Sequence, residues 1–185
     1  MPGFPDFPPV PRVVLDSNVW IDILVFDDLH TRPIRAALER GALHALIDAR
    51  CLGELTYVLD YPQFVKRAVD KQAALETVTR LTQLVAAGAV DTADAPQEQR
   101  QESAQGPTPP QSQQLTPLPL PKCKDRDDQK FLELAHTARA DWLVSKDRAV
   151  LKLARRVARD FGFRIAQPAQ FVEACLLPDE EAEPA

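Results

Sequence analysis

The stretch RVVLDSNVW, residues 12–20, decides the fold of this chain. Its first part, Arg12 to Asp16, is a short run of mainly apolar and β-branched residues, which predicts a buried strand. A helix is expected directly after it, from Asn18 to Phe26. A strand that passes at once into a helix is typical of a parallel α/β sheet. The stretch therefore predicts such a sheet, with a carboxylate at the end of its first strand.

The same alternation of strand and helix continues along the chain. The further predicted strands are residues 45–47, 142–144 and 163–165, and a short strand beginning at Ala89-Val90. The further predicted helices are residues 31–40, 49–60, 63–87, 127–139, 148–159 and 168–176. This order predicts an α/β fold with a parallel sheet.

Proline is concentrated outside these elements. Residues 1–11 and 92–121 hold twelve of the 17 prolines, and the second segment is also rich in Gln. We expect a proline-rich arm at 1–11 and a single domain over 12–178, interrupted by a disordered insert at 92–121. An acidic tail follows at 179–185. A linker is favoured over a proline-rich partner ligand for the insert.

The net charge of −5 is unevenly distributed. Residues 1–11, 91–121 and 179–185 hold nine of the 27 acidic residues and one of the 22 basic ones, so the rest of the chain carries +3. The acidic total argues against a protein that coats nucleic acid by bulk charge. The basic remainder is compatible with local binding of phosphate.

The three cysteines are sparse and have no CxxC spacing, which is typical of reduced thiols. The N-terminus has no basic residue before Arg12 and no apolar segment of a signal peptide. No apolar run is long enough to span a membrane. We expect a cytoplasmic protein with no membrane association.

Two acids stand at the ends of predicted strands. Asp16 ends the first strand, and Asp147 lies just past residues 142–144. Because functional groups gather at the carboxyl ends of parallel strands, both are expected at one edge of the sheet. Either residue taken alone could instead cap the helix that follows it.

Two more acids lie on helices in positions that face a cleft. Asp128 shares a face with the apolar stripe of helix 127–139, and Glu54 flanks the stripe of helix 49–60. For Glu54 taken alone, a solvated surface residue is the alternative. Asp125 and Asp127 do not point toward the buried face of the helix as well as Asp128 does. A capping residue or a solvated charge is the better interpretation for each. Clustered carboxylates without His or Cys suit hard cations such as Mg²⁺ or Mn²⁺.

Four segments resemble the PIN-domain nucleases, especially the toxin components of toxin–antitoxin systems. They are VVLDSNVW (13–20), CLGELTYVLDYPQF (51–64), DRDDQKFLELA (125–135) and ADWLVSKDRAVLKLA (140–154). The resemblance implies a three-layer PIN sandwich with a central parallel sheet flanked by helices. It further implies a Mg²⁺- or Mn²⁺-dependent endoribonuclease, a homodimer and an antitoxin protein as partner.

Carried over position by position, the resemblance assigns the catalytic and metal-binding acids. They are Asp16, Glu54, Asp128 and Asp147. Asn18 and Ser145 would orient these ligands or the water, and divalent ions held there would activate water for attack on a phosphodiester. Ser145 stands where the family usually has Thr. The long insert before the third segment is also unusual and leaves the openness of the pocket undecided.

Basic residues gather on the helix after Asp147 and suggest where RNA binds. Five of them fall on the face opposite its apolar stripe, and Lys146 precedes them; they are Arg148, Lys152, Arg155, Arg156 and Arg159. We expect this ridge to bind RNA phosphates. An ordinary solvated helix face is the alternative.

Two other functions remain open from the sequence. A binding or regulatory module with a degenerate site would act through the proline-rich insert. A phosphohydrolase of the haloacid-dehalogenase type would use Asp16 as a nucleophile. Such sites require a second acid two residues after the nucleophile, where this chain has Asn18.

Overall fold

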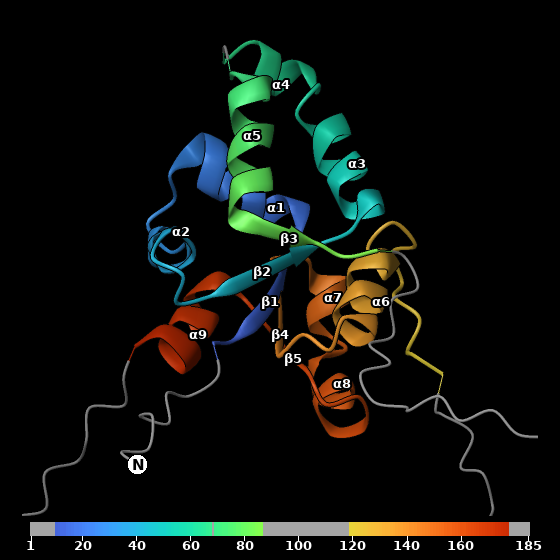
Figure 1. Cartoon of the computed structure of the whole chain (residues 1–185). Coiled ribbons are helices and arrows are strands. Elements are labelled where there is room, and N and C mark those ends of the chain that lie inside the picture. The colour runs from blue at the N-terminus through green and yellow to red at the C-terminus, as the bar shows by residue number, and fades with distance from the viewer. Residues whose placement is uncertain (1–9, 68, 87–118, 178–185) are drawn as a thin grey trace, which may run out of the picture.

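The sheet of the computed structural model has five strands, all parallel (Figure 1). Their order across the sheet is β3-β2-β1-β4-β5. The strands are β1 (Arg12–Leu15), β2 (His44–Ile47), β3 (Thr82–Leu84), β4 (Trp142–Val144) and β5 (Arg164–Ala166). The structure describes residues 10–67, 69–86 and 119–177. The predicted α/β fold with a parallel sheet is confirmed within these residues.

Helices cover both faces of the sheet. The α-helices before β3 are α1 (Ser17–Ile21), α2 (Arg32–Glu39), α3 (Ala49–Val58), α4 (Pro62–Val65) and α5 (Lys71–Leu81). Those after it are α6 (Gln129–Thr137), α7 (Arg148–Leu151), α8 (Ala154–Asp160) and α9 (Pro168–Phe171). Two π-helical segments, η1 (Asp22–Phe26) and η2 (Val172–Leu176), continue α1 and α9. In Figure 1, α1, α2 and α5 lie on one side of the sheet, and α6, α7 and α8 on the other.

The direction of strand addition reverses next to β1. The chain adds β2 and β3 on one side of β1 and then returns to add β4 and β5 on the other side. Such a reversal opens a crevice at the carboxyl ends of the two central strands, where ligands bind in open α/β sheets. The topology therefore places the candidate site at the carboxyl ends of β1 and β4, directly after Leu15 and Val144.

Apolar side chains from the sheet and from the helices on each side form the core. Val13 and Val14 of β1 and Leu143 of β4 are almost fully buried. Because β1 is central and covered on both faces, every residue after Arg12 in this strand is apolar. Trp20 of α1 and Phe131 of α6 add the largest buried side chains next to these strands.

Four predicted helices differ from the observed ones, and one of them, expected over 168–176, changes to π-helix at Val172. The helix expected over 63–87 is instead α4 and α5, because Asp70 caps a new helix by accepting a hydrogen bond from the Ala73 amide at 2.9 Å. Its expected last part is wrong, since Thr82–Leu84 pairs with β2 as an edge strand. The helix expected over 148–159 is divided by a turn at 152–153 into α7 and α8. The helix expected over 18–26 changes to π-helix at Asp22.

Several predicted segments lie mainly or wholly outside the described residues. These are the arm at 1–11, the insert at 92–121, the tail at 179–185 and the strand at Ala89-Val90. In the described part of the chain, no helix has the length and apolar character needed to cross a membrane. All three cysteines are free thiols.

Three of the described α-helices are followed by a residue in the left-handed conformation. Gly41 after α2 has φ +73°, and Gly162 after α8 has φ +77°. Arg139 holds the same position after α6 with φ +49°. Glycine adopts this conformation without strain, whereas an L side chain costs about 1–2 kcal/mol. Arg139 therefore carries local strain that the two glycines avoid.

We predict that Arg139→Gly raises the free energy of unfolding by about 0.5–1 kcal/mol, since relief of strain exceeds the extra chain entropy of glycine. Gly162→Ala should lower it by about 1 kcal/mol, because a Cβ there has no neighbouring atom within 4 Å and only the backbone is strained. Denaturant unfolding measures both values. Arg139→Ala removes the side chain but keeps the strain. Equal effects of Arg139→Ala and Arg139→Gly would contradict the prediction.

Candidate active site

Asp16 and Ser145 connect the ends of the two central strands. The Ser145 hydroxyl is buried and donates a hydrogen bond to Asp16 Oδ2 at 2.5 Å. The same hydroxyl accepts a hydrogen bond from the Asp147 amide at 3.0 Å. Ser145 therefore links the first and fourth predicted acids through one oxygen atom.

Asn18 makes a second connection between the same two segments. Its side-chain amide donates to Asp16 Oδ2 at 2.9 Å, and its Oδ1 accepts from the Lys146 amide at 3.2 Å. The Lys146 ammonium turns away toward Asp22, whose Oδ2 lies 2.6 Å from Nζ. Asn18 thus orients Asp16, while Lys146 is engaged by a buried carboxylate.

Asp147 is held at the start of α7. Its Oδ1 accepts hydrogen bonds from the amides of Ala149 at 2.5 Å and Val150 at 3.3 Å. The helix-capping interpretation of this residue is therefore correct. Both bonds go to Oδ1, so capping does not use the second carboxylate oxygen.

Glu54 reaches the site from α3, where Lys130 of α6 forms an ion pair with it. A second ion pair between the same helices joins Arg50 Nη1 to Glu133 Oε2 at 2.6 Å. The Lys130 ammonium also donates to the Asp127 carbonyl at 2.5 Å. These contacts fix α3 against α6 and orient Glu54.

Asp128 lies at the start of α6, half-buried, and its side chain makes no capping hydrogen bond. Burial, followed by the charges of other acids, raises its pKa to about 7. In decreasing order of effect, those acids are Asp16, Asp147, Asp125 and Glu54. The shift requires that acids from separate parts of the sequence lie close to Asp128.

Asp16 has a shifted pKa for related reasons. Burial raises it, hydrogen bonds from Ser145 and Asn18 act in the opposite direction, and the charge of Glu54 raises it further. The net direction is upward. Burial is therefore the main reason why the ionised form of Asp16 is disfavoured, and the charge of Glu54 adds to it.

The two additional acids differ in their surroundings. Asp125 accepts a hydrogen bond from the Asp127 amide at 3.0 Å, and its charge acts on Asp128. Asp127 has an exposed side chain and contributes its backbone carbonyl to Lys130. Asp125 is thus the nearer of the two to the acid cluster.

The acids fit a divalent cation by their chemistry. Asp16, Glu54, Asp128 and Asp147 offer only oxygen donors, which Mg²⁺ and Mn²⁺ prefer. Burial, and after it the charges of neighbouring acids, raises the pKa values of Asp16 and Asp128, and a bound cation would favour the ionised form of both. Among the described residues, however, no three acidic, His or Cys side chains stand together as a formed metal site.

The sequence interpretation missed two residues beside these acids. Asp48 follows β2 directly, as Asp16 follows β1, and its carboxylate caps α3 by accepting from the Cys51 amide at 2.8 Å. Burial raises its pKa, but hydrogen bonds from Cys51 and Arg50 lower it more. The strand-end rule could have found Asp48. Lys130 could not be found in this way, because its contact with Glu54 depends on helix packing.

Four of the five residues of the basic ridge fall into two pairs with different surroundings. All five residues of the predicted helix face are exposed. Arg159 pairs with Asp160 through two contacts, at 2.6 and 2.9 Å, and Arg156 lies 3.9 Å from the same carboxylate. Arg148 and Lys152 instead line a cavity together with Asp147.

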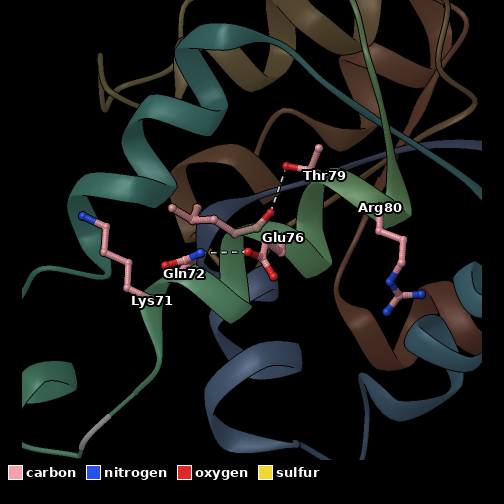
Figure 2. Close-up of a pocket in the computed structure, with 6 residues that line it drawn as sticks. Lys71, Gln72, Glu76, Thr79 and Arg80 are labelled. Carbon is pink, nitrogen blue, oxygen red and sulfur yellow. Dashed lines mark hydrogen bonds between the residues drawn. The ribbon is translucent and has the colours of Figure 1, made fainter.

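A cavity of about 700 Å³ lies along α5, away from the acids. Its described lining residues are Lys71, Gln72, Leu75, Glu76, Thr79 and Arg80. Figure 2 shows the Gln72 amide hydrogen-bonded to Glu76 one turn later, at 3.0 Å. The single acid of this surface is thus already engaged, and none of the predicted site residues is present.

Comparison with known proteins identifies the family. Residues 12–149, which include all four acids of the cluster, match the PIN domain. No curated protein matches the chain. PIN domains are typically nucleases that depend on a divalent metal ion. On this match, which covers roughly three-quarters of the sequence, and on its parallel sheet, the chain belongs to the PIN domain family.

Proposed function

We propose that this protein is an endoribonuclease that uses Mg²⁺ or Mn²⁺ to hydrolyse phosphodiester bonds in RNA. The observation that supports it is the position of Asp128, whose pKa is raised to about 7 by burial and by acids from four other positions in the chain. Perturbed acids in a crevice at the switch point of a sheet are typical of a catalytic site. The family match supports the same class of chemistry.

The residues of the chain would have distinct roles. Asp16, Glu54, Asp128 and Asp147 would hold one or two ions. A bound divalent ion supplies activation of water and stabilisation of charge on the phosphodiester. Ser145 and Asn18 keep Asp16 in one orientation, and the α7 amides do the same for Asp147. Such fixed carboxylates lose little freedom on binding.

Other expectations from the family resemblance stay predictions. They are the toxin role, the antitoxin partner, the homodimer and the cytoplasmic location. All of the assigned RNA contacts, Lys146 and the five residues of the basic ridge, stay predictions too, and the Lys146 ammonium faces Asp22. The regulatory module and the phosphohydrolase are the competing functions, and a cleavage assay separates them from the proposal.

We predict that Asp16→Asn and Asp147→Asn each reduce RNA cleavage by about 100-fold or more, because loss of a metal ligand removes several kcal/mol of transition-state stabilisation. Cleavage of labelled RNA with Mn²⁺ or Mg²⁺ measures this. Asn is also a good helix cap, so Asp147→Asn should keep α7 folded.

Glu39→Gln is the matched control, since this acid lies exposed at the end of α2. Its activity should equal that of the unaltered protein. Cleavage without added metal, or full activity in both Asn variants, would refute the assignment. Phosphate release from a monoester with a trapped aspartyl-phosphate at Asp16 would favour the phosphohydrolase.

The pKa of Asp128 predicts how Mg²⁺ stabilises the protein. Because the carboxyl has a higher pKa in the folded protein than in the unfolded chain, its contribution to stability falls as pH rises from about 4 to about 7. Mg²⁺ must compete with this proton below about pH 7, so its affinity at about pH 5.5 should be roughly 30-fold lower than at high pH. Mg²⁺ should therefore raise Tm much more at about pH 8 than at about pH 5.5.

Thermal unfolding with and without Mg²⁺ at the two pH values tests this prediction. In Asp128→Asn, the metal-free protein should be more stable than the unaltered one at the higher pH, and the Mg²⁺ effect should be small at both. An equal Tm shift at both pH values in the unaltered protein would contradict it.

A further inference from the structure

A cavity of about 610 Å³ adjoins the acid cluster. One wall comes from the segment that leads into α6 and the other from α7 and the turn after it. Its charged lining residues are five cations, Lys122, Lys124, Arg126, Arg148 and Lys152, and two acids, Asp125 and Asp147. Because Asp147 is part of the lining, the cavity adjoins the proposed active site at this residue.

The cations of this cavity are available to a ligand. All five are exposed, and none of them forms an ion pair with any described residue. Arg156 and Arg159, farther along the same basic ridge, are both close to Asp160. The cavity cations therefore differ from Arg156 and Arg159, which have a carboxylate beside them.

We infer that this cavity is a groove for the phosphates of a single-stranded segment of RNA next to the bond that is cut. The inference rests on the proposed function and names its binding site. Cations on two opposite walls surround one backbone, whereas a duplex is bound across a broad surface. No aromatic side chain is among the described residues of the groove, so phosphate contacts dominate and base identity matters little.

The wall of the cavity that lies before α6 was not predicted from the sequence. Lys122, Lys124 and Arg126 lie before α6 and share no helical face with Arg148. Their contribution follows from the packing of that segment against α7. The groove therefore predicts that these three residues matter more for binding than Arg156 and Arg159.

Binding of a labelled oligouridylate of about ten nucleotides, a length within the range of single-strand sites, tests the groove. Fluorescence anisotropy in EDTA at several KCl concentrations gives affinity and its salt dependence without cleavage. Lys122→Ala/Lys124→Ala should weaken binding roughly 25-fold at about 0.1 M salt and reduce the slope of log K against log salt by about 1.4. Oligoadenylate should give similar values.

Arg156→Ala/Arg159→Ala is the matched control, because it removes the same charge from the far end of the ridge. It should weaken binding clearly less than the groove variant does, since neither arginine lines the groove and the Asp160 carboxylate offsets one of the two charges. Equal weakening by both double variants would overturn the groove in favour of bulk charge. Tighter binding of a duplex of the same length would overturn the single-stranded assignment.

The outcome is separable from that of the proposed function. If Asp16→Asn abolishes cleavage but Lys122→Ala/Lys124→Ala leaves binding unchanged, the groove is wrong and the nuclease assignment stands. If the groove variant weakens binding while Asp16→Asn cleaves normally, the protein binds RNA there and the catalytic assignment is wrong.

Discussion

The pairing of β1 with β4 is the constraint on which the rest of the structure depends. It pairs Leu15 with Val144, two residues that are far apart in the sequence. The residues that follow them, Asp16 and Ser145, thereby come within hydrogen-bonding distance. The Asp16 amide extends the ladder by donating to the Val144 carbonyl at 3.0 Å. The same pairing reverses the direction in which strands are added, so the sheet and the crevice arise together. Displacing β4 by one residue would turn Ser145 to the other face and separate it from Asp16.

Much of the fold and part of the site could be predicted from local sequence. The β-branched run of β1 and the apolar run of β2 are strand signals, and the rule that parallel strands share a carboxyl edge predicted Asp16 and Asp147 at the same edge. The choice between a capping and a site residue could not be made for Asp147, because its Oδ1 caps α7 while the carboxylate also influences Asp128. One side chain can therefore cap a helix and also belong to the acid cluster.

Most of the features that escaped prediction depend on packing between distant segments. β3 is a partly polar edge strand directly after a helix, and only its pairing with β2 defines it. Lys130 and Glu54 lie on separate helices, and no periodicity within either helix predicts their ion pair. Asp48 differs, since it follows a strand as Asp16 does, and its position was readable from the sequence. Its carboxylate lies between Arg50 and the Cys51 amide.

The long sequence separation between β1 and β4 also determines when the acid cluster can assemble during synthesis. By the time Asp147 is added, roughly four-fifths of the chain has been made, while the edge of β1 that receives β4 has had no partner strand. A nascent chain can pair β1 with β2 and β2 with β3, but Asp16 then still lacks the Ser145 hydroxyl and the nearby charges of Asp128 and Asp147. The order of translation therefore keeps the complete site from forming while most of the chain is being made beside ribosomal RNA.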